Sequence, residues 1–162
     1  MRLATKKTNM DICNVLGEGI DLYQDEITKN NITVEFNTSS NAELHIFADP
    51  QRLHRLFSNL IFNSLRYTDV GGGLDIEVTD QNDNLCIKFQ DSSPSVNNDN
   101  LSKLFERLYR VDNSRNRKLG GAGLGLFTCK NIVDAHPWTI EVTPSSFGGL
   151  CICIVRPKNS NA

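Results

Sequence analysis

A glycine cluster in the C-terminal third of the sequence could bind an anion. Residues 120–126 read Gly-Gly-Ala-Gly-Leu-Gly-Leu and precede a segment with helical spacing. Glycine tolerates positive φ and lets backbone N–H groups approach a ligand closely, and the following helix N-terminus adds about half a positive charge. The cluster matches neither GxxxxGK[ST] nor a dinucleotide-binding turn, because no strand leads into it. It predicts phosphate binding, with a tight loop packed against a sheet as the alternative.

A second candidate group is a pair of asparagines on a segment with helical periodicity. Asn59 and Asn63 lie one turn apart on one helix face, and Arg66 and Tyr67 follow them. A carboxamide oxygen is a hard, neutral ligand that suits a Mg²⁺ ion already carrying phosphates and water. Arg66 could contact a phosphate, and Tyr67 could stack on a base. The alternative is a pair of capping or solvated asparagines.

A carboxylate ends an apolar stretch with strand-like alternation. Asp91 comes just after Leu85–Phe89 and just before Ser-Ser-Pro-Ser-Val. At the end of a strand it could accept a hydrogen bond from the exocyclic amine of a base. Aspartate also initiates turns, so this residue by itself leaves both interpretations open.

Composition and charge exclude several classes of protein. The 162 residues carry 17 basic and 19 acidic side chains, and 39% are hydrophobic, which fits one folded domain. A net charge of −2 argues against broad nucleic-acid binding and against polybasic membrane contact. The longest apolar run, Leu150–Val155, is far shorter than the roughly 20 residues that span a bilayer. Residues 1–10 lack the apolar core of a signal peptide.

Cysteines and histidines do not form a metal or disulfide pattern. The five cysteines include no CxxC pair, so buried thiols in a reducing compartment are the preferred interpretation. His45, His54 and His136 lack metal-ligand spacing, and we expect no transition-metal site.

The hydrophobic pattern predicts the elements that must position these residues. A helix over 11–29 is expected to begin at an Asp11 cap, and a helix capped by Asp49, with Pro50 at its first position, is expected to run to about Tyr67. A short helix near Asn100–Tyr109, a mobile loop over 111–121 and a helix over 124–135 follow. Alternation predicts strands in hairpin-like pairs, namely Ile32–Phe36, Glu43–Phe47, Leu74–Thr79, Leu85–Phe89, Thr139–Val142 and Leu150–Val155.

This order predicts an α/β (α+β) two-layer sandwich whose mixed sheet is covered on one face by about three helices. A doubly wound nucleotide-binding fold would need strict alternation of strands and helices, which is absent. The domain is expected over residues 11–157, with a linker remnant over 1–10 and a C-terminal tail over 158–162.

Taken in chain order, these motifs resemble the catalytic, ATP-binding domain of bacterial sensor histidine kinases, within the Bergerat-fold (GHKL) ATPase group. Residues 56–68 resemble the N box, 104–110 the F box and 120–126 the second glycine box. The stretches 91–96 and 105–117 look most like the BaeS type of envelope-stress sensor kinase.

The resemblance implies a role for each site residue. Asn63 would coordinate Mg²⁺, Asn59 would lie near the γ-phosphate, and Asp91 would accept from the adenine amino group. Arg66 would contact phosphate and Tyr67 would flank adenine. The lid would contain Phe105, Arg107 and Arg110, and the phosphates of ATP would lie against Gly121, Gly123, Leu124 and Gly125.

The resemblance also implies partners. The phosphoacceptor histidine would lie on a helical dimerisation domain upstream of this chain, because none of the three histidines has the surroundings of the family's acceptor motif. A response regulator would act downstream. The isolated domain would be monomeric, and the full-length kinase would be dimeric and anchored in the inner membrane with this domain in the cytoplasm.

Two departures from the family pattern leave alternatives open. Ser93 and Ser95 stand where the first glycine box has glycines, beside Pro94, which favours weaker nucleotide binding. His136-Pro137-Trp138 replaces the usual HGG, and we expect a shorter turn there with structural consequences only. The alternatives are a nucleotide-binding signalling module with weak or lost kinase activity, and a serine kinase of the anti-sigma type.

Overall fold

The computed structural model of this chain describes residues 6–38, 44–81, 84–92, 105 and 125–157. The helices are α1 (Ile12–Leu22), α2 (Gln24–Lys29), α3 (Pro50–Tyr67) and α6 (Gly125–Ala135). The strands are β1 (Thr8–Asp11), β2 (Thr33–Thr38), β3 (His45–Ala48), β4 (Gly73–Gln81), β5 (Asn84–Asp91), β6 (Thr139–Pro144) and β7 (Leu150–Pro157).

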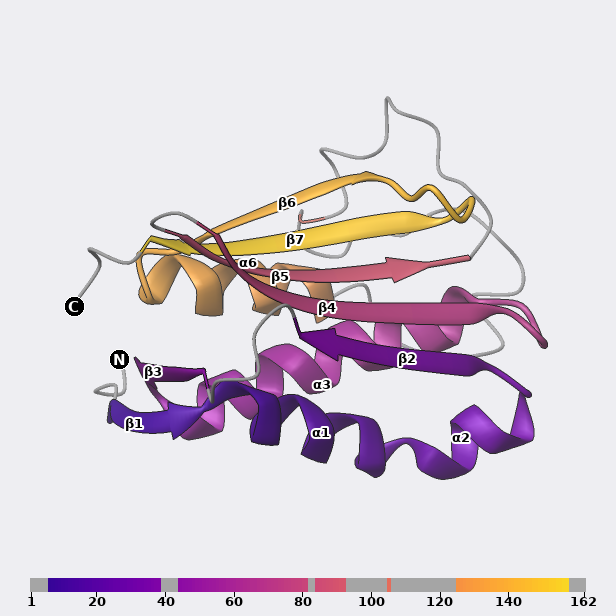
Figure 1. Cartoon of the computed structure of the whole chain (residues 1–162), viewed down its shortest axis with the longest axis horizontal. Helices are drawn as coiled ribbons and strands as arrows, with labels where there is room; N and C mark the ends of the chain where they lie inside the picture. Colours follow the sequence, from indigo (N-terminus) through magenta and orange to yellow (C-terminus); the bar gives the residue numbers. More distant parts are fainter. Residues whose placement is uncertain (1–5, 39–43, 82–83, 93–104, 106–124, 158–162) are drawn as a thin grey trace.

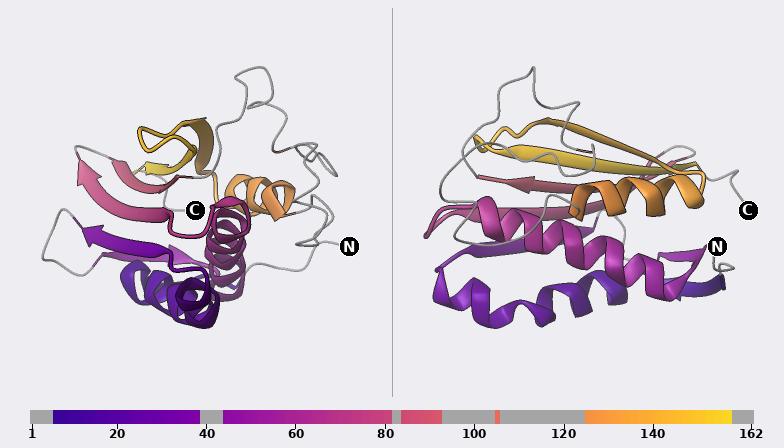
Figure 2. Two further views of the ribbon diagram at one scale, coloured as in Figure 1. Left: turned by 90° about the vertical axis from the view of Figure 1, so that its right-hand side faces the viewer. Right: turned by 180° about the vertical axis from the view of Figure 1, so that it is seen from behind.

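Two layers make up the described part of the molecule. Five strands form one sheet in the order β2-β4-β5-β7-β6, and α1, α3 and α6 lie along one of its faces (Figures 1 and 2). The pair β2–β4 is parallel, whereas β4–β5, β5–β7 and β6–β7 are antiparallel. The hydrophobic core fills the space between the sheet and the helices. The predicted two-layer sandwich with a mixed sheet is confirmed.

Helix α3 forms as the sequence predicts. The carboxylate of Asp49 accepts hydrogen bonds from the backbone N–H groups of Gln51 and Arg52, at 3.1 and 3.3 Å, and Pro50 occupies the first turn. The helix ends at Tyr67, before the glycines at 71–73. Its predicted apolar stripe is buried, and its members are Leu53, Leu56, Phe57, Leu60, Ile61 and Ser64, joined by Leu65.

The predicted helix over 11–29 is two helices. Asp11 caps α1 as expected, since its side chain accepts from the N–H of Cys13 at 2.9 Å. The helical path breaks at Tyr23, and α2 continues for only six residues. The break lets the Tyr23 ring pack on Phe62 of α3, with 5.8 Å between ring centroids. This contact is tertiary, so the helical spacing of the sequence could not predict it.

The first predicted hairpin is wrong. The strands predicted at 32–36 and 43–47 correspond to β2 and β3, but they do not pair with each other. β2 runs parallel to β4, with Val34 opposite Leu74, and β3 pairs with β1, with Ile46 opposite Met10. All of strand β1 except Asp11 lies within residues 1–10, which were interpreted as a linker remnant. It has four residues with no apolar alternation, so it carries no local strand signal.

The other two hairpins, β4–β5 and β6–β7, are confirmed, as is a helix beginning at the end of the glycine cluster. The predictions for the short helix near 100–109 and the loop over 111–121 lie outside the described residues, except for Phe105.

Candidate nucleotide-binding site

Helices α3 and α6 lie side by side and antiparallel (Figure 2). Near the start of α3, the backbone N–H of Asp49 donates to His136 Nε2, just beyond the end of α6, at 3.3 Å. About two turns further along α3, the Cys129 thiol contacts the carbonyl oxygen of Leu56 at 3.7 Å. Because both helices rise about 1.5 Å per residue, the same register places Gly125 at about the level of Leu60. The start of α6 therefore lies beside the turn of α3 that carries Asn59 and Asn63.

The asparagine pair can receive a ligand. Asn59 and Asn63 are half-buried at the edge of the apolar stripe. Neither side chain forms a hydrogen bond with another residue in the described part of the chain. Two carboxamide groups one turn apart therefore have donor and acceptor atoms available next to the N-terminus of α6.

Arg66 and Tyr67 form one unit at the end of α3. The guanidinium carbon of Arg66 lies 4.8 Å from the centroid of the Tyr67 ring and 5.8 Å from that of Phe62. Arg66 Nη2 also donates to the Tyr67 hydroxyl at 2.5 Å. The cation therefore lies over aromatic rings, and among the described residues its buried Nε has no hydrogen-bond partner.

Asp91 is held firmly at the end of β5. Asp91 lies two residues after buried Phe89, so both side chains are on the sheet face that is covered by the helices. Only 3% of the Asp91 surface is exposed. The N–H of Leu150, at the start of β7, donates to its Oδ1 at 3.0 Å, and the N–H of Gly149 donates to its carbonyl oxygen at 3.2 Å. These bonds fix the plane and direction of the carboxylate.

Asp91 lies near the last turns of α3, because α3 and β5 run in the same direction. Phe57 of α3 packs on Phe89 of β5, with ring centroids 6.1 Å apart. Further along both elements, Thr68 and Ser92 approach the same point. A Cβ built on Gly72 would lie 2.5 Å from Thr68 Cγ2 and 2.6 Å from Ser92 Oγ. The site residues thus converge from α3, β5 and α6.

The remaining predicted site residues are only partly described. Phe105 is half-buried and packs against the hydrophobic core. Gly125 is the exposed first residue of α6, with open space around it. Arg107, Arg110, Gly121, Gly123 and Leu124 lie outside the described residues.

His136 connects the two site helices at their far ends. It is 1% exposed, its Nδ1 lies 2.9 Å from the carbonyl oxygen of Ile132, and its Nε2 accepts from Asp49. Burial lowers the pKa of His136, so the neutral tautomer with a proton on Nδ1 satisfies both contacts. Trp138 N–H donates to the carbonyl oxygen of Val133 at 3.2 Å, a Schellman-type closure of α6 with Pro137 at a φ of +28°.

Sequence reasoning missed several residues around the site. Leu150 supplies the backbone donor to Asp91 from 59 positions away, and no local pattern could predict that pairing. Ser64 was counted only as part of the apolar stripe of α3. Thr68, Gly72 and Ser92 form the close contact that joins the end of α3 to the end of β5.

Among the described residues, no group of three or more acidic, cysteine or histidine side chains is placed so that it could bind a metal ion. Among the same residues, no helix has the length and apolarity needed to cross a membrane. The five cysteines are free thiols. Burial raises the pKa of Cys129 to about 12 and that of Cys153 to about 11, so both are protonated at neutral pH.

Comparisons with known proteins agree with this geometry. Residues 48–160 match the family described as "Histidine kinase-, DNA gyrase B-, and HSP90-like ATPase". The chain is 40% identical over 155 residues to the signal transduction histidine-protein kinase BaeS of Escherichia coli (strain K12), covering 96% of this chain and 33% of BaeS. The chain thus spans about a third of the length of this curated relative.

Two solved structures share the fold. The catalytic domain of histidine kinase ThkA, in a nucleotide-free form, aligns with a TM-score of 0.84 at 24% identity, over 95% of this chain and 97% of that one. Histidine kinase ThkA in complex with the response regulator protein TrrA aligns with a TM-score of 0.79 at 22% identity, over 95% and 42%. The family model matches well over half of the chain, and we conclude that the chain belongs to the family of histidine kinase-, DNA gyrase B- and HSP90-like ATPases.

Proposed function

We propose that this chain binds ATP with Mg²⁺ and transfers its γ-phosphoryl group to a histidine on a helical dimerisation domain that lies outside the chain. The observation that carries the proposal is the convergence of three elements. The asparagine pair of α3, the N-terminus of α6 and the anchored carboxylate of Asp91 meet at one end of the layer between sheet and helices. Phosphoryl transfer requires mainly positioning and charge neutralisation, which such a site can provide.

In this proposal Asp91 reads the base. Leu150 N–H holds one carboxylate oxygen, so the carboxylate presents a fixed acceptor surface to the exocyclic amine of adenine. Tyr67, half-buried at the end of α3, flanks the base, and Arg66 lies over Tyr67, from where its guanidinium can turn toward a phosphate. Guanine carries a carbonyl where adenine carries the amine, so adenine is preferred.

The asparagines hold the metal and the reacting phosphate. The fit rests on the donor set: Asn63 offers a half-buried amide oxygen that is not used by another described residue. Mg²⁺, when bound, neutralises charge on the triphosphate. Asn59, one turn earlier, lies near the γ-phosphate. Around the phosphates, the proposal places Gly121, Gly123, Leu124 and Gly125 as backbone donors, and Phe105, Arg107 and Arg110 in the lid.

The acceptor histidine belongs to another domain. His136 is buried and bonded at both ring nitrogens, and His54 pairs with Glu18 at 2.9 Å in the first half of α3. His45 lies on β3, in the small sheet formed with β1. None of them lies at the convergence of α3, α6 and β5. We further propose that the full-length kinase is dimeric and anchored in the inner membrane. This domain would lie in the cytoplasm, and a response regulator would act downstream.

Calorimetry tests nucleotide binding first. Titration with ATP or a non-hydrolysable analogue, with and without Mg²⁺, is expected to give a micromolar dissociation constant, equivalent to about −8 kcal/mol or weaker. Absence of heat and of a thermal shift at millimolar nucleotide would refute the proposed site.

Labelling with γ-labelled ATP then tests transfer. The isolated chain is expected to gain no phosphohistidine, whereas adding the helical domain of the same protein in trans restores slow labelling. Binding without any transfer in trans would favour the signalling module with lost activity, for which Ser93, Pro94 and Ser95 are the motivating residues.

A further inference from the structure

One basic side chain beside the asparagine pair has no ion-pair partner. Helix α3 carries four basic residues, and three of them are already engaged: Arg52 pairs with Asp49 at 3.8 Å, His54 pairs with Glu18 at 2.9 Å, and Arg66 lies over the Tyr67 ring. The fourth, Arg55, is exposed and forms no ion pair or hydrogen bond within the part of the chain that the structure describes. Its charge is therefore available to a ligand.

Arg55 lies one turn before Asn59 and two turns before Asn63 on α3. Side chains four residues apart on a helix are neighbours, so the three residues form one row. The charge of Arg55 also acts on α6. Burial raises the pKa of the Cys129 thiol to about 12, and the nearby positive charge of Arg55 opposes that rise. Because Cys129 is one turn after Gly125, the guanidinium lies close to the first turns of α6.

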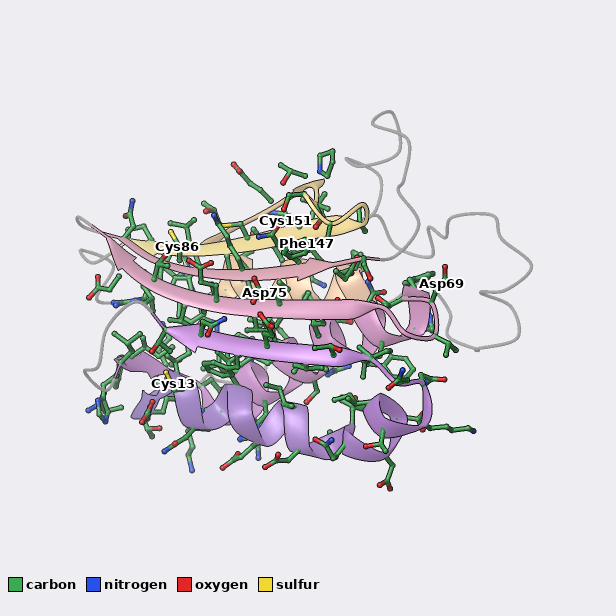
Figure 3. All side chains as sticks on the ribbon, turned by 45° about the vertical axis from the view of Figure 1, so that its right-hand side comes forward. Cys13, Asp69, Asp75, Cys86, Phe147 and Cys151 are labelled. Atoms are coloured by element: carbon green, nitrogen blue, oxygen red, sulfur yellow. The ribbon has the colours of Figure 1, made fainter. Side chains whose placement is uncertain are left out.

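The row of three residues has a direction relative to the proposed nucleotide. The base is proposed at Asp91, near the last turns of α3, and Asp69, just after the helix, marks this end in Figure 3. With the metal at Asn63 and the γ-phosphate at Asn59, the nucleotide runs back along the helix. Arg55 lies about 6 Å beyond Asn59 along the helix axis, on the side away from the base. A phosphoryl group that leaves ADP therefore moves toward Arg55.

We propose that Arg55 is a further catalytic residue, whose guanidinium contacts the γ-phosphoryl group while this group moves from ADP to the acceptor histidine. In this step a ring nitrogen of the histidine forms a bond to phosphorus. The bond from phosphorus to the oxygen that bridges the β- and γ-phosphates breaks, and its electron pair leaves on ADP. Arg55 stays protonated, and the proton on the other ring nitrogen of the histidine remains there.

The charge of Arg55 suits this step. In the transition state of phosphoryl transfer, negative charge is spread over the three equatorial oxygens of the transferred group, and a guanidinium beside them stabilises it. Asn59 and Asn63 are neutral, so the row gains its positive charge from Arg55. The inference rests on the proposed function, because it needs the γ-phosphate at Asn59 and a histidine from the helical domain.

The test separates nucleotide binding from transfer, by calorimetry with ATP and by labelling of the helical domain in trans with γ-labelled ATP. Arg55→Gln removes the charge and is expected to lower kcat for transfer by about a hundredfold, as loss of one group that stabilises transition-state charge does. The dissociation constant for ATP and the KM for the helical domain are expected to stay within about twofold, because the contact forms only during transfer. Arg55→Lys keeps the charge and is expected to recover about tenfold of the lost rate.

Lys130→Gln is the matched control, because it also removes one positive charge from the neighbourhood of Cys129. Lys130 follows Cys129 on α6, and its ammonium pairs with Asp134 at 2.8 Å, one turn further from the start of α6. This variant is expected to keep kcat within about twofold of the wild type. Arg55 and Lys130 make no buried contact, so each variant is expected to melt within about 2 °C of the wild type.

The outcomes distinguish this inference from the proposed function. If the wild type does not label the helical domain, both are refuted. If the wild type labels it and Arg55→Gln keeps kcat within about threefold, only the role of Arg55 is overturned. A higher KM for the helical domain at unchanged kcat also overturns this role, because Arg55 then contributes to docking and not to transfer. An equal fall of kcat in Lys130→Gln overturns it as well, since the effect is then one of general charge.

Discussion

Replacing Asp91 by asparagine tests the base-reading role most directly. The N–H of Leu150 donates to Oδ1 at 3.0 Å, and the residue is 3% exposed. In the variant the carboxamide oxygen must keep this bond, because turning the NH₂ group toward Leu150 would oppose two buried donors. The NH₂ group then points at the base, where it meets the amine of adenine, another donor. The anchoring bond of the native structure thus dictates how the variant fails.

The expected size of the loss follows from the bond that is removed. A hydrogen bond to a charged group contributes about 1.5–3 kcal/mol, so the dissociation constant for ATP is expected to rise by about 10- to 150-fold. The carbonyl of guanine can accept from the new NH₂ group, so affinity for GTP is expected to stay or improve. Calorimetry with both nucleotides measures the ratio, and Asp75→Asn, on the opposite face of the sheet, is the matched control. A variant at Asp91 that keeps the wild-type preference for ATP would show that this carboxylate does not read the base.

Three further outcomes are expected from other parts of the structure. Asn63→Asp places a negative charge beside the triphosphate, so the rate of phosphotransfer is expected to fall by about a hundredfold. Because Asn63 is half-buried and lies outside the apolar stripe of α3, the melting temperature is expected to change by less than about 2 °C. Pro137→Gly is expected to raise the free energy of unfolding by about 1 kcal/mol in urea titrations. Pro137 has a φ of +28°, which is unfavourable for proline, and glycine also restores an N–H at the end of α6. A destabilised variant would contradict this account of the turn. Burial lowers the pKa of His136, so the unfolded chain binds more protons than the folded chain below about pH 6.5. The free energy of unfolding is therefore expected to lose nothing from this residue above about pH 6.5, and to fall by up to about 1.4 kcal/mol per pH unit from there down to the folded-state pKa. His136→Gln is expected to show a smaller fall.

Features that depend on local sequence patterns were predicted correctly. Asp49 and Pro50 marked the start of α3, and the spacing of Asn59 and Asn63 placed both at the edge of its buried stripe. Asp91 was assigned to the end of a strand, where the structure has it. Each of these features depends on neighbours within a few residues, so periodicity and capping rules were sufficient.

Long-range pairing could not be predicted in the same way. Nothing near Val34 indicates that β2 would join β4 in parallel, or that β3 would pair with the polar residues of β1. The donor from Leu150 to Asp91 depends on how β5 and β7 meet. Ser64 fits an apolar stripe by its spacing, and only the three-dimensional structure shows that its buried hydroxyl has no hydrogen-bond partner among the described residues. The departure at Pro137 and Trp138 was expected to have structural consequences only, and the structure has there the bond from Trp138 N–H to the carbonyl oxygen of Val133 and a positive φ at Pro137.

Asp49 forms hydrogen bonds with three segments of the chain. The N–H of Lys6 donates to Asp49 Oδ2 at 3.2 Å, the other carboxylate oxygen caps α3, and the backbone N–H of Asp49 donates to His136 at the end of α6. One residue therefore joins the chain before β1 to both helices that carry site residues. Asn59 and Asn63 lie about 15 to 21 Å further along α3, and an α-helix bends little over that length. The bonds at Asp49 thus join the start of α3 to the end of α6, whereas Leu150 at the start of β7 holds Asp91 to the sheet.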